Sequence, residues 1–101
     1  MKKTFLLAIA LLCFCAPMSL FAQKQLAFKH GKFKFVQFTD IHWDQKSSKC
    51  AKTVATIQSV LKAENPDVAM LTGDVVTANP GLEGWKSVIG IFEEAKIPFT
   101  V

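Results

Sequence analysis

Acidic and imidazole side chains gather directly after an apolar stretch of this sequence. The segment "FKFVQFTDIHWD" begins at Phe33 as an alternating strand pattern and then places Asp40, His42 and Asp44 close together. A second apolar run, "DVAMLTGD", also ends in an acid, Asp74. Carboxylate and imidazole groups together are suitable ligands for zinc, iron or manganese, and a shared carboxylate would allow a two-metal centre. A metal site is therefore one interpretation of these residues.

The same acids also have a purely structural interpretation. Acidic residues at strand ends often cap a following helix or bind water, and an Asp-x-His pair alone is a weak motif. Asp44 fits this interpretation better than a ligand role, because a helix is expected shortly after it. The residues by themselves therefore leave a metal site and a group of solvated acids as alternatives.

The expected elements begin with a hairpin. In "LAFKHGKFKFVQF", two short strands are predicted around His30 and Gly31, because glycine supplies the positive φ that a hairpin turn needs. His30 is accordingly expected to be a solvent-facing turn residue and not a ligand. The strand after the turn alternates phenylalanine with lysine and becomes more apolar toward Phe38, so burial is expected to deepen along it.

An amphipathic helix is predicted next, within "SSKCAKTVATIQSVLKAENPD". Its apolar residues recur at spacings of four, three and four, which define one helix face. The residues of this face are Cys50, Val54, Ile57 and Leu61. Ser47 or Ser48 can cap the start, while Asn65 and Pro66 can stop the helix. Cys50 is expected to be a core residue rather than a nucleophile, since no base lies near it in the sequence.

The remaining segments continue the alternation of strand and helix. The apolar run between Pro66 and Gly73 suits a parallel strand that is covered on both faces. A second helix is expected after it, and "KIPFTV" is typical of a third strand. The inner face expected for that helix consists of Trp85, Val88, Ile89 and Phe92. The order of elements predicts an α/β fold, a hairpin followed by a right-handed βαβαβ unit with a mainly parallel sheet.

This topology predicts where the polar residues meet. In open parallel sheets, ligands bind outside the carboxyl ends of the strands. Asp40 and His42 follow one such end, and Asp74 follows the next. Because neighbouring strands lie about 5 Å apart, these three side chains are expected to converge on one point.

The motifs "TDIHW", "PDVAMLTGDVVT" and "IPFTV", in this order and spacing, resemble the calcineurin-like metallophosphoesterases, and more closely their bacterial purple-acid-phosphatase-like branch. The opening "LAFKHGKFKFVQFTDIHW" is similar to the start of the catalytic domain of that branch. The resemblance covers Leu26 to Val101. It implies that this segment is the N-terminal part of a metallophosphoesterase-type αββα sandwich.

The resemblance also implies a function, that of a metal-dependent phosphatase acting on a small phosphate-ester substrate. By matching position, Asp40 and His42 would bind the first of two divalent or trivalent ions (Fe, Zn or Mn), and Asp74 would bridge both ions. A metal-bound hydroxide would attack phosphorus in line, with no catalytic residue separate from the metal ligands. The residues agree with this, since a chain without arginine would need metal charge to hold a phosphate.

Two departures from the family pattern restrict this expectation. The chain has "GDVVTAN" where protein phosphatases of the family carry a further Asp and Arg, which disfavours a phosphoprotein substrate. Thr77 stands where the purple enzymes have a tyrosine ligand, and the chain contains no tyrosine, so an iron–tyrosinate centre is not expected. Trp43 has no transferable role and is expected to pack at the rim of the site.

The family's next motif, a glycine, asparagine, histidine and acid, would begin just beyond Val101. Residues 23–101 are therefore expected to form an incomplete N-terminal part of the phosphoesterase domain, a fragment with little or no activity alone. The alternative is a small exported binding or interaction domain whose acids are solvated or hold one structural ion. A flavodoxin-like phosphate-binding unit is disfavoured, because no glycine-rich turn follows the first strand.

The first 22 residues have the layout of a secretory signal peptide. Lys2 and Lys3 precede the apolar "FLLAIALLCFCA", and the small residue Ala22 ends the stretch. Leu20 fits the cleavage site imperfectly, which leaves a retained membrane anchor as the alternative. The apolar run is, however, near the lower limit for a span and is interrupted by Pro17. Cleavage after Ala22 predicts a periplasmic or secreted protein.

Removal of this segment also changes the partners that the chain can attract. The formal charge falls from +4 to +2 with the loss of the two N-terminal lysines, so neither nucleic-acid binding nor stable membrane insertion is expected after cleavage. Cys50 becomes the only cysteine, which excludes an internal disulfide.

Overall fold

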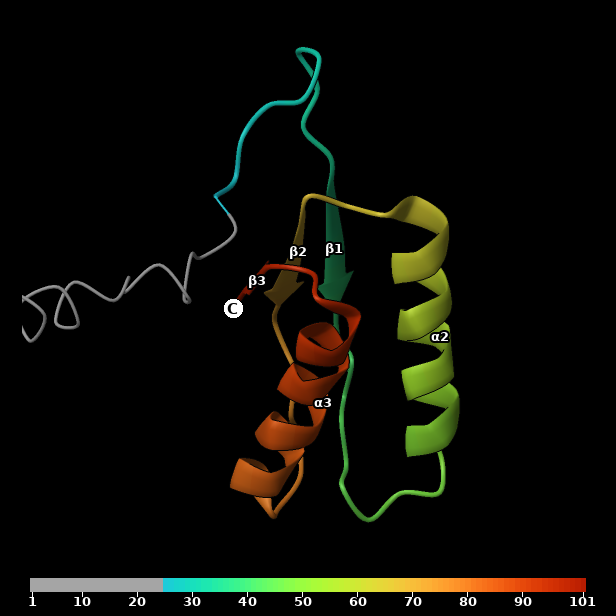
Figure 1. Cartoon of the computed structure of the whole chain (residues 1–101). Coiled ribbons are helices and arrows are strands. Elements are labelled where there is room, and N and C mark those ends of the chain that lie inside the picture. Colours follow the sequence, from blue (N-terminus) through green and yellow to red (C-terminus); the bar gives the residue numbers. More distant parts are fainter. Residues whose placement is uncertain (1–24) are drawn as a thin grey trace, which may run out of the picture.

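The computed structural model describes residues 25–101, so the predicted signal peptide lies outside the described residues. The elements along the chain are strand β1 (Phe35–Thr39), helix α2 (Cys50–Glu64), strand β2 (Val68–Thr72), helix α3 (Gly81–Ala95) and strand β3 (Phe99–Thr100). The strands pair in parallel in the order β1-β2-β3. The predicted α/β fold is confirmed at this level, as a three-stranded parallel sheet with two helices (Figure 1).

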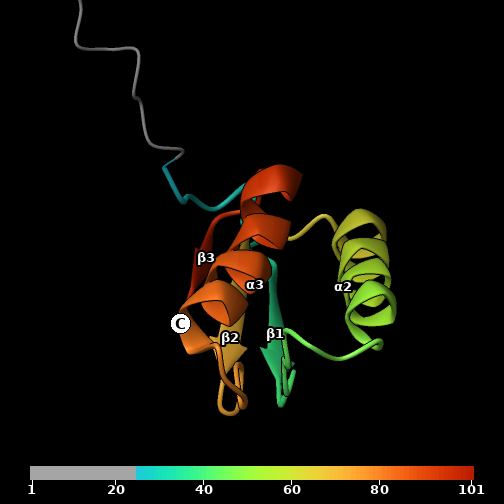
Figure 2. The same cartoon turned by 90° about the horizontal axis from the view of Figure 1, so that it is seen from below.

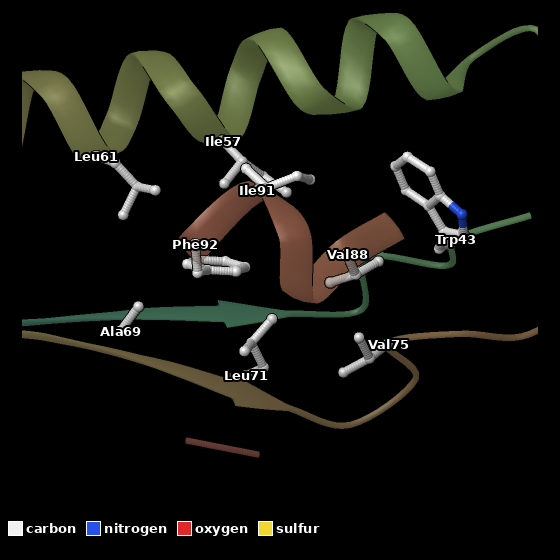
Figure 3. Close-up of a cluster of buried hydrophobic side chains, with 9 residues drawn as sticks. All are labelled: Trp43, Ile57, Leu61, Ala69, Leu71, Val75, Val88, Ile91 and Phe92. Carbon is white, nitrogen blue, oxygen red and sulfur yellow. The ribbon is translucent and has the colours of Figure 1, made fainter. Parts of the chain in front are cut away.

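Both helices cover the same face of the sheet (Figure 2). Right-handed crossovers that advance in one direction, from β1 to β2 to β3, place each connecting helix on one side. The side chains buried between the helices and this face are drawn in Figure 3: Trp43, Ile57, Leu61, Ala69, Leu71, Val75, Val88, Ile91 and Phe92. The ring centroid of Phe92 lies 5.6 Å from those of Phe38 and Phe99, so this one residue of α3 contacts both outer strands.

The expectation that β2 is covered on both faces is wrong for the described residues. Ala69 and Leu71 are buried against the helices, whereas Val68 and Met70 on the opposite face are only half-buried. Phe35, the register partner of Val68, is 58% exposed. The apolar run does not reveal this asymmetry, because strand order and crossover direction decide which face the helices cover.

The predicted hairpin is reduced to its turn. Lys29 and Lys32 exchange backbone hydrogen bonds of 2.9 and 3.0 Å around a turn in which His30 is exposed and has a positive φ. This pairing is a single antiparallel bridge, and within residues 25–101 no strand precedes β1. Phe28, which would stabilise a longer hairpin, is 75% exposed. A two-stranded arm without buried apolar contacts is at best marginally stable, which explains the difference.

Helix α2 begins differently from the prediction and ends as predicted. Its N-cap is Lys49, which makes no side-chain cap bond, so neither Ser47 nor Ser48 caps the helix. Ser47 lies two residues before the N-cap, and its Oγ instead accepts the Lys49 N–H at 3.2 Å. At the other end, Asn65 adopts the left-handed conformation and its N–H donates to the Leu61 carbonyl, as a C-cap does.

The inner helix faces follow the predicted periodicity with one exception. In α2, Ile57 and Leu61 are buried and the other two predicted residues pack half-buried against the core. In α3, Val88 and Phe92 are buried as predicted, while Ile91 is buried in place of Ile89. Ile91 follows Val88 by three residues and so lies on the same helix face, and Figure 3 shows it beside Ile57 of α2. Neither α2 nor α3 has the length and apolarity required to cross a membrane.

Candidate metal site

The parallel register brings the ends of β1 and β2 to the same level. Thr39 and Thr72, the last residues of the two strands, are register partners. Asp40 follows β1 directly, and Asp74 follows β2 after Gly73. Both strands point to the same edge of the sheet (Figure 1). Asp40 and Asp74 are far apart in the sequence, but the pairing of β1 with β2 places them close together in space.

Backbone hydrogen bonds continue this pairing beyond the strands. The residues after β1 donate to carbonyl groups after β2, and one bond returns in the opposite direction. The pairs are Asp40 N–H to Gly73 O (3.1 Å), His42 N–H to Asp74 O (2.9 Å), Trp43 N–H to Val75 O (2.8 Å) and Thr77 N–H to Trp43 O (3.2 Å). These bonds hold the two loops together, so the candidate ligands lie on paired backbone rather than on independent loops.

Trp43 anchors the loop after β1, because its side chain packs in the hydrophobic core. Its side chain is only 5% exposed, and its Nε1 donates to Gln45 Oε1 at 2.8 Å, an oxygen that also accepts from Ser87 of α3. A Cβ built on Gly84 would lie 3.2 Å from Trp43 Cδ1 and 2.8 Å from a methyl group of Val76, so α3 approaches these loops closely because this position is glycine. Trp43 is a packing residue as predicted, but it lies in the core rather than at a rim.

The three candidate ligands share an uncommon backbone conformation. The φ angles are 53° at Asp40, 50° at His42 and 43° at Asp74. This left-handed region costs residues with a Cβ roughly 1–2 kcal/mol each, although Asp and His adopt it more often than most. The other described non-glycine residues with a positive φ lie in the turn before β1 or at the C-caps of α2 and α3, where this conformation is ordinary.

The structure brings Asp40, His42 and Asp74 together. One possible ligand atom from each lies within 4.8 Å of the others, and His42 Nε2 lies 3.6 Å from Asp40 Oδ1. Ligand atoms that share one zinc-sized ion, each about 2.0–2.2 Å from it, can be at most about 4.4 Å apart. Because all three side chains are exposed, small rotations would bring their atoms within that limit. We call these three residues the Asp-His-Asp cluster.

The donor set of this cluster fits Fe, Zn or Mn, which accept imidazole together with carboxylate ligands. Exposed acids also cluster without an ion, so the geometry by itself assigns no metal. No lysine forms an ion pair with either carboxylate of the cluster among residues 25–101. The two carboxylates at this edge therefore have no lysine partner among the described side chains.

Asp44 and Cys50 lie outside the cluster and have structural roles. The Asp44 carboxylate accepts the Lys46 N–H at 3.0 Å, and its carbonyl oxygen accepts hydrogen bonds from the Ser47 N–H and from Cys50 Sγ. Asp44 thus organises the turn that leads into α2, in agreement with the helix-proximal interpretation. Cys50 is half-buried and packs against the core, as predicted.

Thr39 is a neighbour of the cluster that the sequence did not single out. Its hydroxyl donates to Asp40 Oδ2 at 2.7 Å. The only signal for this contact is its position directly before Asp40 at the end of a strand, because the direction of a hydroxyl depends on the local backbone turn. The sequence alone does not specify that turn.

Comparison of the chain with protein-family models, with curated proteins and with solved structures found no match.

Proposed function

We propose that this chain contributes three metal ligands to a calcineurin-like metallophosphoesterase of the purple-acid-phosphatase-like branch, an exported hydrolase of small phosphate esters. Asp40 and His42 would hold one ion, and Asp74 would be shared with a second ion. The observation that carries the proposal is the convergence of these side chains within 4.8 Å at the carboxyl ends of two neighbouring parallel strands. The left-handed backbone at all three residues supports it, because such conformations persist at sites where the surroundings fix an orientation.

Bound Fe, Zn or Mn ions would supply positive charge to phosphoryl oxygens and make water a better nucleophile. The part of this chain is to hold and orient the ligands, through the paired loops and the buried Trp43. Phosphate is usually bound by arginine or lysine, yet the sequence has no arginine, and no lysine pairs with the cluster in the described part of the chain. Phosphate binding at this edge is therefore expected to require the metal.

Three ligands are too few for a two-metal centre. The only other histidine of the sequence is His30, which lies in the turn between Lys29 and Lys32, before the amino end of β1. The remaining ligands would come from parts of the complete enzyme other than residues 25–101. We accordingly expect the chain alone to bind metal and to hydrolyse an aryl phosphate weakly or not at all.

Calorimetric titration of the full chain with Zn²⁺ tests the ligand assignment. Asp40→Asn, His42→Ala and Asp74→Asn should each weaken binding at least about tenfold, since even the loss of a group that only orients a ligand costs this much. Asp44→Asn is the matched control, because it removes the same charge nearby while leaving an oxygen that can accept the Lys46 N–H.

The control variant should bind Zn²⁺ as the unaltered chain does. Equal weakening by all four substitutions would indicate a general attraction of cations to acidic residues. The assignment of a metal site to the cluster would then fail.

Phosphate binding distinguishes a phosphoesterase site from a structural ion site. In ³¹P NMR, inorganic phosphate should broaden in the presence of the Zn²⁺-loaded chain and stay sharp with the metal-free chain. Asp74→Asn should reduce the broadening. A Zn²⁺-loaded chain that leaves the phosphate signal unchanged would contradict the phosphoesterase proposal even if the metal binds tightly.

A second candidate function is that of a small exported binding or interaction domain. The open face of the sheet favours it, since Phe35 is exposed there beside the half-buried Val68 and Met70. A binding module should remain monomeric and soluble on its own, whereas part of a larger domain should associate through its open face and strand edges. A monodisperse monomer in light scattering that also binds no Zn²⁺ would favour this candidate.

A further inference from the structure

The last residue of β1 contacts the candidate ligand that follows it. Thr39 Oγ donates to Asp40 Oδ2 at 2.7 Å, a distance typical of a short hydroxyl–carboxylate hydrogen bond. The other oxygen, Asp40 Oδ1, lies 3.6 Å from His42 Nε2. The two oxygens of one carboxylate therefore face different partners, a hydroxyl on one side and the Asp-His-Asp cluster on the other.

We propose that Thr39 is a positioning residue that leaves Asp40 Oδ1 as the single metal-binding oxygen of this carboxylate. This inference rests on the proposed metal site. A carboxylate that rotates freely can present either oxygen, or both, to an ion. A donor on Oδ2 removes that freedom and fixes the plane of the group, which is how hydrogen-bond partners of metal ligands tune affinity.

The sheet holds Thr39 in the place that this role requires. It is the register partner of Thr72, and both side chains lie on the open face of the sheet. The Thr72 hydroxyl accepts a hydrogen bond from Gln37 Nε2 at 2.8 Å. Two threonines at the same level of the same face thus differ in their partners, because only the Thr39 hydroxyl is bonded to a candidate ligand. Thr72 is therefore a matched control for Thr39.

Zn²⁺ titration of the full chain tests the role of Thr39. Thr39→Val keeps the branched shape and removes the hydroxyl, so the affinity should fall about tenfold to 100-fold. Thr39→Ser keeps the hydroxyl and should bind close to the unaltered chain, as should Thr72→Val. The visible absorption of bound Co²⁺ gives a second readout: it should change in Thr39→Val, which loses the fixed carboxylate, and be restored in Thr39→Ser.

The outcomes separate this inference from the proposal on which it rests. If the unaltered chain binds no Zn²⁺, or if Asp40→Asn binds as tightly as the unaltered chain, the metal site fails and the role of Thr39 falls with it. If Asp40→Asn loses binding while Thr39→Val keeps it, the site stands and the role of Thr39 alone is overturned.

Equal weakening by Thr39→Val and Thr72→Val would also overturn the role of Thr39, because the loss would then come from the sheet and not from one hydroxyl. Should Thr39→Val unfold the chain, Thr39→Ala lacks the same hydroxyl and gives the same comparison with Thr39→Ser.

Discussion

The two ends of the parallel sheet carry acids of the same kind in opposite electrostatic surroundings. At the amino end, Asp67 lies 3.5 Å from the Lys29 ammonium and Glu64 lies 3.0 Å from that of Lys34. At the carboxyl end, the two carboxylates of the Asp-His-Asp cluster pair with no lysine of residues 25–101. The sequence has twelve basic residues against eight acids, so a scarcity of lysine does not explain the difference. The proposed metal would supply the charge that lysines supply at the other end.

The two histidines make the same contrast. His30 and His42 have nearly equal φ angles, 53° and 50°. His30 occupies an exposed turn flanked by lysines, whereas His42 has a carboxylate oxygen 3.6 Å from its ring nitrogen. A similar backbone therefore holds one histidine in an ordinary turn and the other among candidate ligands. His30 and His42 therefore differ in the side chains that surround them and not in their backbone conformation.

The largest difference in stability between the two ends is expected from substitution of their aromatic residues, Trp43 and Phe35. Trp43→Ala at the carboxyl end should lower the free energy of unfolding by about 3–5 kcal/mol, because it empties a buried position. Phe35→Ala at the amino end should change it by no more than about 0.5 kcal/mol, since this side chain is mostly exposed. Urea unfolding of both variants measures the difference, and equal losses would contradict the burial described for Trp43.

A smaller difference in stability is expected between substitutions of Asp67 at the amino end and Asp74 at the carboxyl end of the sheet. Asp67 Oδ2 accepts the Lys34 N–H at 2.8 Å, so Asp67→Asn should cost about 1 kcal/mol of stability through a weaker hydrogen bond and ion pair. In the metal-free chain, Asp74→Asn should leave stability within about 0.5 kcal/mol or raise it slightly, because a like-charge repulsion is removed. Metal-free thermal unfolding checks both, and a larger loss in Asp74→Asn would show that this carboxylate is compensated after all.

The smallest effect is expected at the exposed pair of Glu64 and Lys34. About half of each side chain is accessible to solvent, so Glu64→Gln should cost at most about 0.2–1 kcal/mol. The difference should diminish in 1 M salt, which screens surface charges. Unfolding at low and high salt measures it. A loss that exceeds that of Asp67→Asn and resists salt would mean that this pair, and not Asp67, holds the amino end together.

The sequence predicted the features that depend on local periodicity and chain order. The spacing of Ile57 and Leu61 identified the buried face of α2, because a helix repeats every 3.6 residues. The convergence of Asp40, His42 and Asp74 was predicted because consecutive parallel strands are usually neighbours. The side of the sheet that the helices cover was not predicted, since Val68 and its neighbours follow a continuous apolar pattern whichever face is open.

Features that depend on tertiary contacts or single hydrogen bonds were missed. Ile91 was missed although it lies three residues after Val88 on the same helix face, because helical spacing alone does not choose between Ile89 and Ile91 and the contact with Ile57 of α2 does. The hairpin failed because no other element covers Phe28. The contact between the Thr39 hydroxyl and Asp40 depends on the left-handed turn that begins at Asp40. The isolated turn before β1 and the hydrogen bond of Thr39 have no periodic signal in the sequence.

The contrast between the two histidines offers the most direct measurement. Imidazole ¹H–¹⁵N NMR spectra of the full chain can be followed while Zn²⁺ is added, because His30 precedes β1 and His42 follows it, so that one histidine reports from each end of the strand. The proposed site predicts that the His42 ring signals shift to those of a metal-bound imidazole, while the His30 signals stay unchanged. An equal response of both rings, or no response of His42, would contradict a metal site at the carboxyl end of the sheet.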